Sequence, residues 1–157
     1  MRSTLYKGID VYKKIMVATD GTKLSRKAVE AASKLAVELS ATLTIVRVVP
    51  SYPKTFFDGS SILSIKEMDD FEKELSEKAQ ASLDQLLKTT VDKHISVNTV
   101  VTRSTNVSDA LLKVAKKSKA ELIVMASHGR GGIKRVLLGS ETLQVLTHSE
   151  IPVLVIR

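Results

Sequence analysis

Short, continuously apolar runs alternate along the chain with longer segments in which apolar residues recur at every third or fourth position. An apolar run bounded by turn residues predicts a buried strand, and the longer spacing predicts a helix with one apolar face. The sequence predicts strands at residues 14–19, 42–49, 94–102, 121–126 and 152–156. It predicts helices at residues 24–39, 65–88, 107–117 and 140–148, the third with Asn106 as its N-cap.

The alternation of strands and helices is typical of a parallel sheet that carries helices on both faces. The run Leu122–Met125 has no polar alternation, which indicates a strand covered on both sides. We therefore expect an α/β fold, a three-layer α/β/α open sheet of five mainly parallel strands. Residues 13–157 are expected to form a single domain that follows an N-terminal extension of residues 1–12.

The composition narrows the class of protein. With 157 residues, of which 43% are hydrophobic and 26% charged, the chain is typical of one folded domain. It has no cysteine, which excludes thiolate metal sites and a cysteine nucleophile. No apolar run approaches the roughly 18 residues that span a bilayer, and residues 1–14 lack the apolar core of a secretory signal. We therefore expect a cytoplasmic protein without a membrane partner.

The net charge of +7 favours anionic partners. The positive charge is dispersed, apart from four lysines late in the third predicted helix, where cations complement the helix dipole. These are Lys113, Lys116, Lys117 and Lys119. Aromatic residues make up 4% of the chain and tryptophan is absent, which leaves few side chains to stack on bases. The sequence therefore disfavours nucleic acid as the partner.

A glycine-rich stretch, residues 126–140, leaves the carboxyl end of a predicted buried strand and ends where a helix begins. In open α/β sheets, ligands bind outside the carboxyl ends of strands, where the strand order reverses. Glycines at 129, 131 and 132 allow positive φ and a close approach of a ligand to backbone N–H groups. Gly139 and Ser140 add N–H donors at a helix start and a hydroxyl. Two donor clusters suit a chain of phosphates; the alternative is a surface turn followed by a helix cap.

Two better-known phosphate motifs are absent. No string matches the Walker A loop, and the dinucleotide fingerprint would need glycine where this chain has Lys134. The chain instead resembles the universal stress protein family from about Lys13 to Arg157. The ATP-binding members of that family carry the pattern Gly-x2-Gly-x9-Gly-Ser/Thr. Gly129, nine further residues and Gly139-Ser140 match its second half, and the segments 14–21 and 151–156 are also typical.

Ala126 stands where the family pattern has its first glycine. A methyl group is tolerated there if φ is negative, as is normal at a strand end, and strained if φ is positive. The family also has a branch that does not bind ATP, so the departure keeps both branches open.

The resemblance implies an adenine nucleotide alpha hydrolase-like (Rossmann-like) fold and a site for ATP, AMP or another adenine nucleotide, with Mg or Mn. Asp20 is expected to face the ribose or a metal on the phosphates, its alternative being a turn residue before Gly21. His128 is expected to pack or to contact the ribose rather than to act in catalysis. The residues implied in nucleotide binding are Ala18, Thr19, Asp20, Val48, Met125, Ala126, Ser127, His128, Gly129, Arg130, Gly131, Gly132, Gly139, Ser140 and Glu141.

The last predicted strand is almost wholly apolar and is expected at a sheet edge, which invites pairing. The resemblance implies a homodimer through residues 152–156, and the alternative is that the N-terminal extension covers this strand. The first functional hypothesis is thus a dimeric, nucleotide-binding regulatory protein of the stress response. It has no convincing general base, so hydrolysis of ATP would be slow at most. A nucleotide-free interaction protein of the same fold is the second hypothesis, and an adenylyl- or phosphoryl-transferring enzyme is a weaker third.

Overall fold

The computed structural model describes residues 11–52, 65–129 and 138–157. These residues form five strands and four helices in strict alternation, as the sequence predicts. In chain order they are β1 (Lys14–Ala18), α1 (Lys23–Leu39), β2 (Thr42–Pro50), α2 (Ile65–Thr90), β3 (Val97–Ser104), α3 (Val107–Ser118), β4 (Leu122–Ala126), α4 (Ser140–His148) and β5 (Val153–Ile156).

One predicted boundary is wrong by several residues, since β3 begins at Val97 rather than at residue 94. The residues before it form a turn, in which the backbone N–H of His94 donates to Asp92 Oδ1 at 2.8 Å. An aspartate side chain that bonds two residues onward stabilises a turn in place of a strand. The apolar Ile95 therefore extends the alternating pattern without extending the strand.

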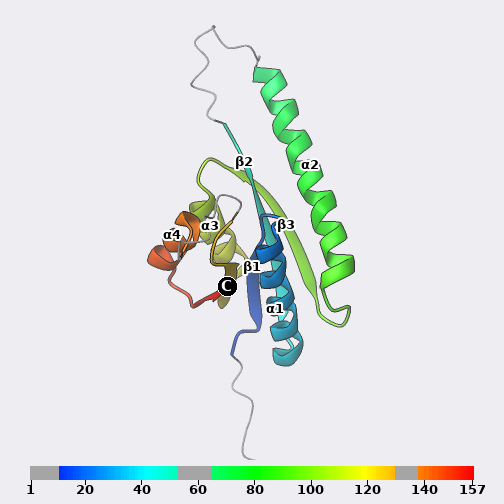
Figure 1. Cartoon of the computed structure of the whole chain (residues 1–157), viewed down its shortest axis with the longest axis vertical. Coiled ribbons are helices and arrows are strands. Elements are labelled where there is room, and N and C mark those ends of the chain that lie inside the picture. Colours follow the sequence, from blue (N-terminus) through cyan, green and yellow to red (C-terminus); the bar gives the residue numbers. More distant parts are fainter. Residues whose placement is uncertain (1–10, 53–64, 130–137) are drawn as a thin grey trace, which may run out of the picture.

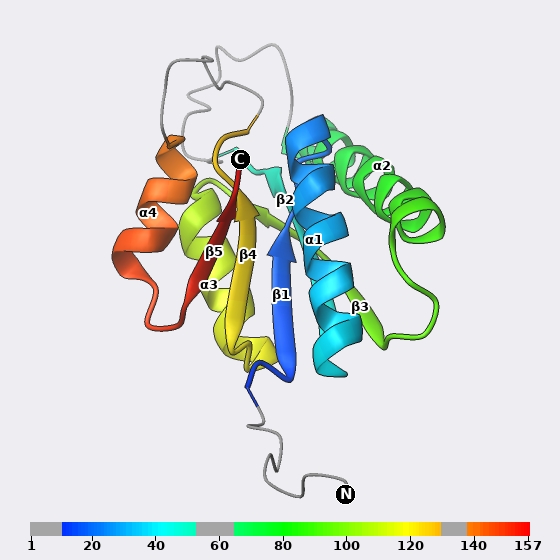
Figure 2. The same cartoon turned by 60° about the horizontal axis from the view of Figure 1, so that its bottom comes forward.

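The five strands form one sheet in the order β3-β2-β1-β4-β5, and every neighbouring pair is parallel. The chain runs outward from β1 to β2 and β3, and then crosses to β4 and β5 on the other side of β1. The strand order therefore reverses between β1 and β4. Helices α1 and α2 lie on one face of the sheet and α3 and α4 on the other, which gives three layers (Figures 1 and 2).

Two aliphatic cores hold these layers together, one on each face of the sheet. Alternate residues of β1 divide between them, with Ile15 and Val17 in the core under α1 and α2 and Met16 in the core under α3 and α4. All five residues of β4 are buried, and they divide in the same way. The continuous apolar runs thus arise because both faces of the central strands are covered.

Because the strands are parallel, their carboxyl ends meet at one edge of the sheet, and α1, α3 and α4 all begin at that edge. Side chains cap two of these starts. Thr22 accepts a hydrogen bond from the backbone N–H of Ser25, and Asn106 accepts one from that of Asp109, as predicted. None of the helices in the described ranges is long and apolar enough to cross a membrane.

Glu72, on α2, joins that helix to the carboxyl ends of β2 and β3. Its Oε1 accepts hydrogen bonds from the backbone N–H of Tyr52 at 2.8 Å and from the Ser51 hydroxyl at 3.0 Å. Its Oε2 accepts one from Arg103 Nη1 at 3.2 Å. Glu72 is only 6% exposed. The Tyr52 N–H first, and then Ser51 and the Arg103 charge, lower the pKa of Glu72 against the opposing effect of burial.

We predict that Glu72→Gln lowers the free energy of unfolding at pH 7 by about 1–3 kcal/mol, because the bond from Arg103 is lost and the bonds from Tyr52 and Ser51 lose their charge assistance. The pKa of Glu72 is lower in the folded chain than its ordinary value of 4.5. The stabilisation is therefore fully present above that pH and is lost as the pH falls through the folded pKa. Urea unfolding across a pH series should show the two proteins begin to converge as the pH falls below about 4.5, with the difference gone below the folded pKa.

Glu77→Gln is the matched control, since Glu77 is an exposed carboxylate on the same helix. It should leave the free energy of unfolding unchanged at every pH. A Glu72→Gln protein as stable as the parent at pH 7 would contradict the role given to this carboxylate.

Candidate functional site

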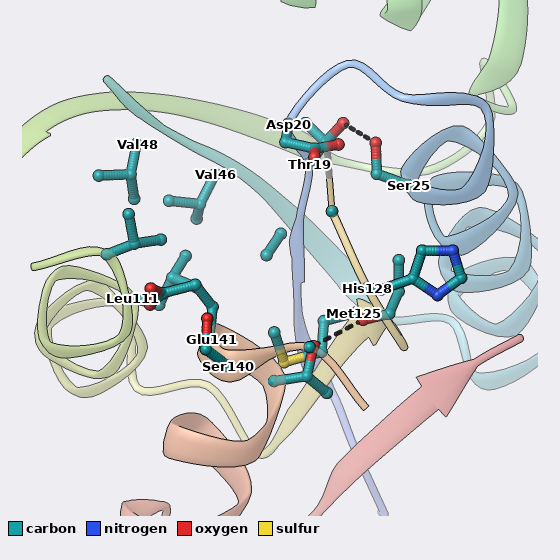
Figure 3. A pocket seen from close by; sticks show the side chains of 16 residues that line it. Thr19, Asp20, Ser25, Val46, Val48, Leu111, Met125, His128, Ser140 and Glu141 are labelled. Atoms are coloured by element: carbon teal, nitrogen blue, oxygen red, sulfur yellow. Dashed lines mark hydrogen bonds between the residues drawn. The ribbon is translucent and has the colours of Figure 1, made fainter. Parts of the chain in front are cut away.

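A cavity of about 500 Å³ opens at the carboxyl edge of the sheet, where the strand order reverses. This volume lies within the range of roughly 300–1,000 Å³ that is common for small-molecule sites. Its wall comes from the ends of β1, β2 and β4 and from the starts of α1, α3 and α4 (Figure 3). The predicted residues that line it are Ala18, Thr19, Asp20, Val48, Met125, Ala126, His128, Gly129, Gly139, Ser140 and Glu141.

The structure does not place every predicted residue on this wall. Ser127 is buried, and its backbone is used elsewhere, with its N–H donating to Ile156 O at 2.7 Å and its carbonyl accepting from Gly139 N at 2.7 Å. Arg130, Gly131 and Gly132 lie outside the described residues. The lining residues that the sequence reasoning missed are Ser25, Val46, Val107, Leu111 and Thr142.

One end of the cavity is apolar. Val46 and Val48 of β2 face Leu111 of α3, and Met125 of β4 lines the wall beside them (Figure 3). These four side chains offer only van der Waals contact, and the Glu141 carboxylate lies at the border of this end, beside Leu111. This end is therefore suited to a flat apolar ring system rather than to a charged group.

The opposite end is polar and includes Asp20. Its Oδ1 accepts hydrogen bonds from the backbone N–H of Thr22 at 3.0 Å and from the Thr22 hydroxyl at 2.7 Å. Gly21 follows with φ of 85°, so Asp20 also makes the turn that the alternative interpretation predicted. Behind it, the Thr19 and Ser25 hydroxyls are 3.0 Å apart and buried. Asp20 is thus both a turn residue and part of the cavity wall.

Gly129 and Gly139 are required for close approach and not for positive φ. A Cβ atom at Gly129 would lie 2.8 Å from Asp20 Oδ2, and one at Gly139 would lie 3.2 Å from His128 Cα. Gly139 has φ of −71°, and Gly129 is not among the positive-φ glycines. At Gly129 the structure therefore uses the small size of glycine and not its access to positive φ. At Gly139 the missing side chain lets the two ends of the 127–139 loop meet.

Ala126 meets the condition under which a methyl group is tolerated. It is the last residue of β4, paired in parallel with Ile156 of β5, and its φ is not positive. Its carbonyl accepts a hydrogen bond from the Thr142 hydroxyl at 2.9 Å, which joins the end of β4 to α4. The alanine therefore fits the strand without backbone strain, and its side chain lines the cavity.

Helix α4 begins at Ser140 without a side-chain cap on its N-cap residue, Gly139. The first N–H groups of a helix have no partner within the helix and carry its positive partial charge, so this start favours an anion. Gly139, Ser140 and Glu141 all line the cavity there. The side chain of Glu141 turns to α3, where its Oε2 accepts from Ser108 N at 2.9 Å. His128 Nδ1 lies 3.1 Å from the Ser127 hydroxyl.

The lining residues that sequence reasoning missed differ in the sequence pattern that could have indicated them. Val46 lies two positions before Val48 on β2 and shares its face, so the period of a strand points to it. Val107 and Leu111 are one turn apart at the start of α3, directly after the carboxyl end of β3. Both have the spacing of core residues, because an apolar cavity wall and a core have the same pattern.

A doubly wound parallel sheet with a cavity at its switch point defines an α/β protein of the Rossmann-like class. Comparison with known proteins gives the family: the model of the universal stress protein family matches residues 11–157. Universal stress protein MJ0531 of Methanocaldococcus jannaschii is 31% identical over 159 residues, covering 100% of this chain and 89% of that protein. The chain belongs to the universal stress protein family.

Solved structures agree with this assignment. The structure of MJ0577, a protein of Methanocaldococcus jannaschii, has a TM-score of 0.74 at 25% identity, and the match covers 93% of this chain and 96% of the MJ0577 chain. A universal stress protein solved in complex with cAMP has a TM-score of 0.63 at 23% identity, and the match covers 94% of this chain and 98% of that protein. The second likeness establishes the fold alone.

We predict that Gly139→Ala lowers the free energy of unfolding by about 1–2 kcal/mol, because its methyl group would press on the backbone of His128. Ser140→Ala, one position along and exposed, is the matched control and should change it by less than about 0.5 kcal/mol. Urea unfolding measures both. Equal stability of the Gly139→Ala protein and its parent would show that the ends of the loop are not held this closely.

Proposed function

We propose that this chain is a nucleotide-binding member of its family, a cytoplasmic regulator of the stress response that takes ATP, AMP or another adenine nucleotide. The observation that carries the proposal is the division of one cavity into an apolar end and a polar end. The apolar end at Val48 and Leu111 suits the adenine ring, and the start of α4 at Ser140 suits phosphate. The relative solved with cAMP holds a ligand of the same chemical class.

The remaining wall residues fit the same ligand. Asp20 would meet the ribose hydroxyls or a Mg or Mn ion carried by the phosphates, since its Oδ2 faces Gly129 at the polar end. Among the described residues there is no cluster of three or more histidine, cysteine, aspartate or glutamate side chains able to hold a metal. A metal would therefore be bound by Asp20 together with the ligand. Hydrolysis of ATP at this site would be slow at most.

The proposal includes a homodimer through β5. This strand is at the sheet edge and pairs with β4 on one side, so its other side presents backbone N–H and C=O groups. Leu154 of β5 is 40% exposed, and Leu143 and Leu146 of the preceding helix α4 are 52% and 38% exposed. Antiparallel pairing with the β5 strand of a second copy would cover both the backbone edge and these leucines.

We predict that the purified protein binds ATP and AMP in isothermal titration calorimetry, with or without Mg²⁺. Gly129→Val should weaken this binding at least tenfold, because its side chain would enter the polar end and displace the Asp20 carboxylate. The fold should survive, since Gly129 is exposed. Lys93→Val, at an exposed turn of the opposite sheet edge, is the control and should bind as the parent does.

No heat of binding at millimolar nucleotide, together with no nucleotide released on denaturation, would overturn the proposal. The nucleotide-free interaction protein would then be the better hypothesis.

We predict a dimer in size-exclusion chromatography with light scattering, and a monomer for Leu154→Lys, because a lysine ammonium would be buried unpaired at the strand edge. Val37→Lys replaces an apolar residue that is 39% exposed and belongs to α1, outside β5 and α4, and it should remain dimeric. A monomeric parent protein, or a Leu154→Lys protein that is still dimeric, would contradict the β5 interface.

A further inference from the structure

Glu141 places a carboxylate between the starts of two helices. It is the second residue of α4, directly after Ser140, and it lines the cavity. Its Oε2 accepts a hydrogen bond of 2.9 Å from the backbone N–H of Ser108, the second residue of α3. In Figure 3 the Glu141 side chain reaches from α4 toward α3, beside Leu111. The carboxylate is therefore fixed on the cavity wall and does not swing freely into solvent.

The position of this carboxylate has a physical reason. The first turns of α3 and α4 both carry positive partial charge at the cavity, and a carboxylate beside such N–H groups is stabilised. Glu141 supplies that anion itself, and its carboxylate occupies one backbone N–H donor of α3. A phosphate in the cavity would therefore bind the N–H groups at the start of α4, next to the negative charge of Glu141.

The repulsion between this charge and a ligand grows with the charge of the ligand. Each phosphate added to a nucleotide adds about one negative charge. Phosphates bound at the start of α4 would lie next to Glu141, the second residue of that helix, whose carboxylate points toward α3. Glu141 is exposed, so solvent and salt screen the interaction, with a Debye length of about 8 Å at physiological ionic strength. The adenine end, lined by Val48 and Leu111, is indifferent to the number of phosphates.

We propose that Glu141 is a specificity-determining residue of this site, which lowers affinity for a nucleoside triphosphate relative to a nucleoside monophosphate. This inference rests on the proposed nucleotide site. The residue acts through its charge, held in place by Ser108, and it needs no contact with the ligand. Charge selection of this kind determines which adenine nucleotide the protein binds when several are present together.

The variant Glu141→Gln separates charge from structure. A glutamine side chain keeps a carbonyl oxygen that accepts the Ser108 N–H, so the link between α3 and α4 persists while the negative charge is removed. Glu150→Gln is the matched control, because it removes the same charge from an exposed residue between α4 and β5, outside the cavity wall. Unfolding in urea should show that both variants retain the stability of the parent.

The experiment compares AMP, ADP and ATP by calorimetry in the presence of EDTA, so that no metal ion offsets the phosphate charges. In Glu141→Gln, the ratio of ATP affinity to AMP affinity should rise roughly three- to fivefold, with ADP in between. The rise should shrink in 0.5 M salt, which a purely structural role of Glu141 would not produce. Glu150→Gln should leave the ratio unchanged.

The two proposals fail in different ways. If the parent binds nucleotides and Glu141→Gln leaves the ratio unchanged, or if Glu150→Gln shifts it equally, the role of Glu141 is overturned and the nucleotide site stands. If neither the parent nor Glu141→Gln binds any of the three nucleotides, the site and the inference built on it are both overturned.

Discussion

The burial of β1 and β4 on both faces is the constraint on which the rest of this molecule depends. The strands are parallel, and each parallel connection needs a helix that returns across a face of the sheet, so the helices cover both faces. Parallel strands bring all their carboxyl ends to one edge. The cavity exists at that edge because α1 and α4, the helices that follow β1 and β4, lie on opposite faces where the strand order reverses.

The two glycines that border the cavity show how closely this edge is packed. Gly139 lets Ser127 and His128 meet the start of α4, with the Gly139 N–H bonded to Ser127 O at 2.7 Å. Gly129 leaves space for the Asp20 carboxylate. In both cases the backbone conformation is one that other residues adopt, so the requirement comes from neighbours far along the chain. A glycine in a ligand-binding motif need not indicate an unusual turn.

Apolar periodicity was enough to predict the nine elements and their order, because burial of each strand and helix face is a local property of its residues. The exception, residues 94–96, has the alternating pattern of a strand but a turn fixed by Asp92.

The polar part of the site could be located from strand ends and helix starts, and the family resemblance supplied residues such as Val48. Leu111 could not be separated from core residues by pattern. The contact between Glu141 and Ser108 joins residues 33 positions apart, and its side-chain direction is set by packing that spacing does not encode.

The contacts of Glu72 have a consequence for how this family can vary. They tie Tyr52, just after β2, to Glu72 within α2, so a single carboxylate joins the two elements on either side of the intervening connection. Lengthening a connection between two elements that are already joined costs little, because loop-closure entropy grows only slowly with length. Insertions and deletions between these two elements can therefore accumulate during evolution while β2, and with it Val48 on the cavity wall, keeps its position.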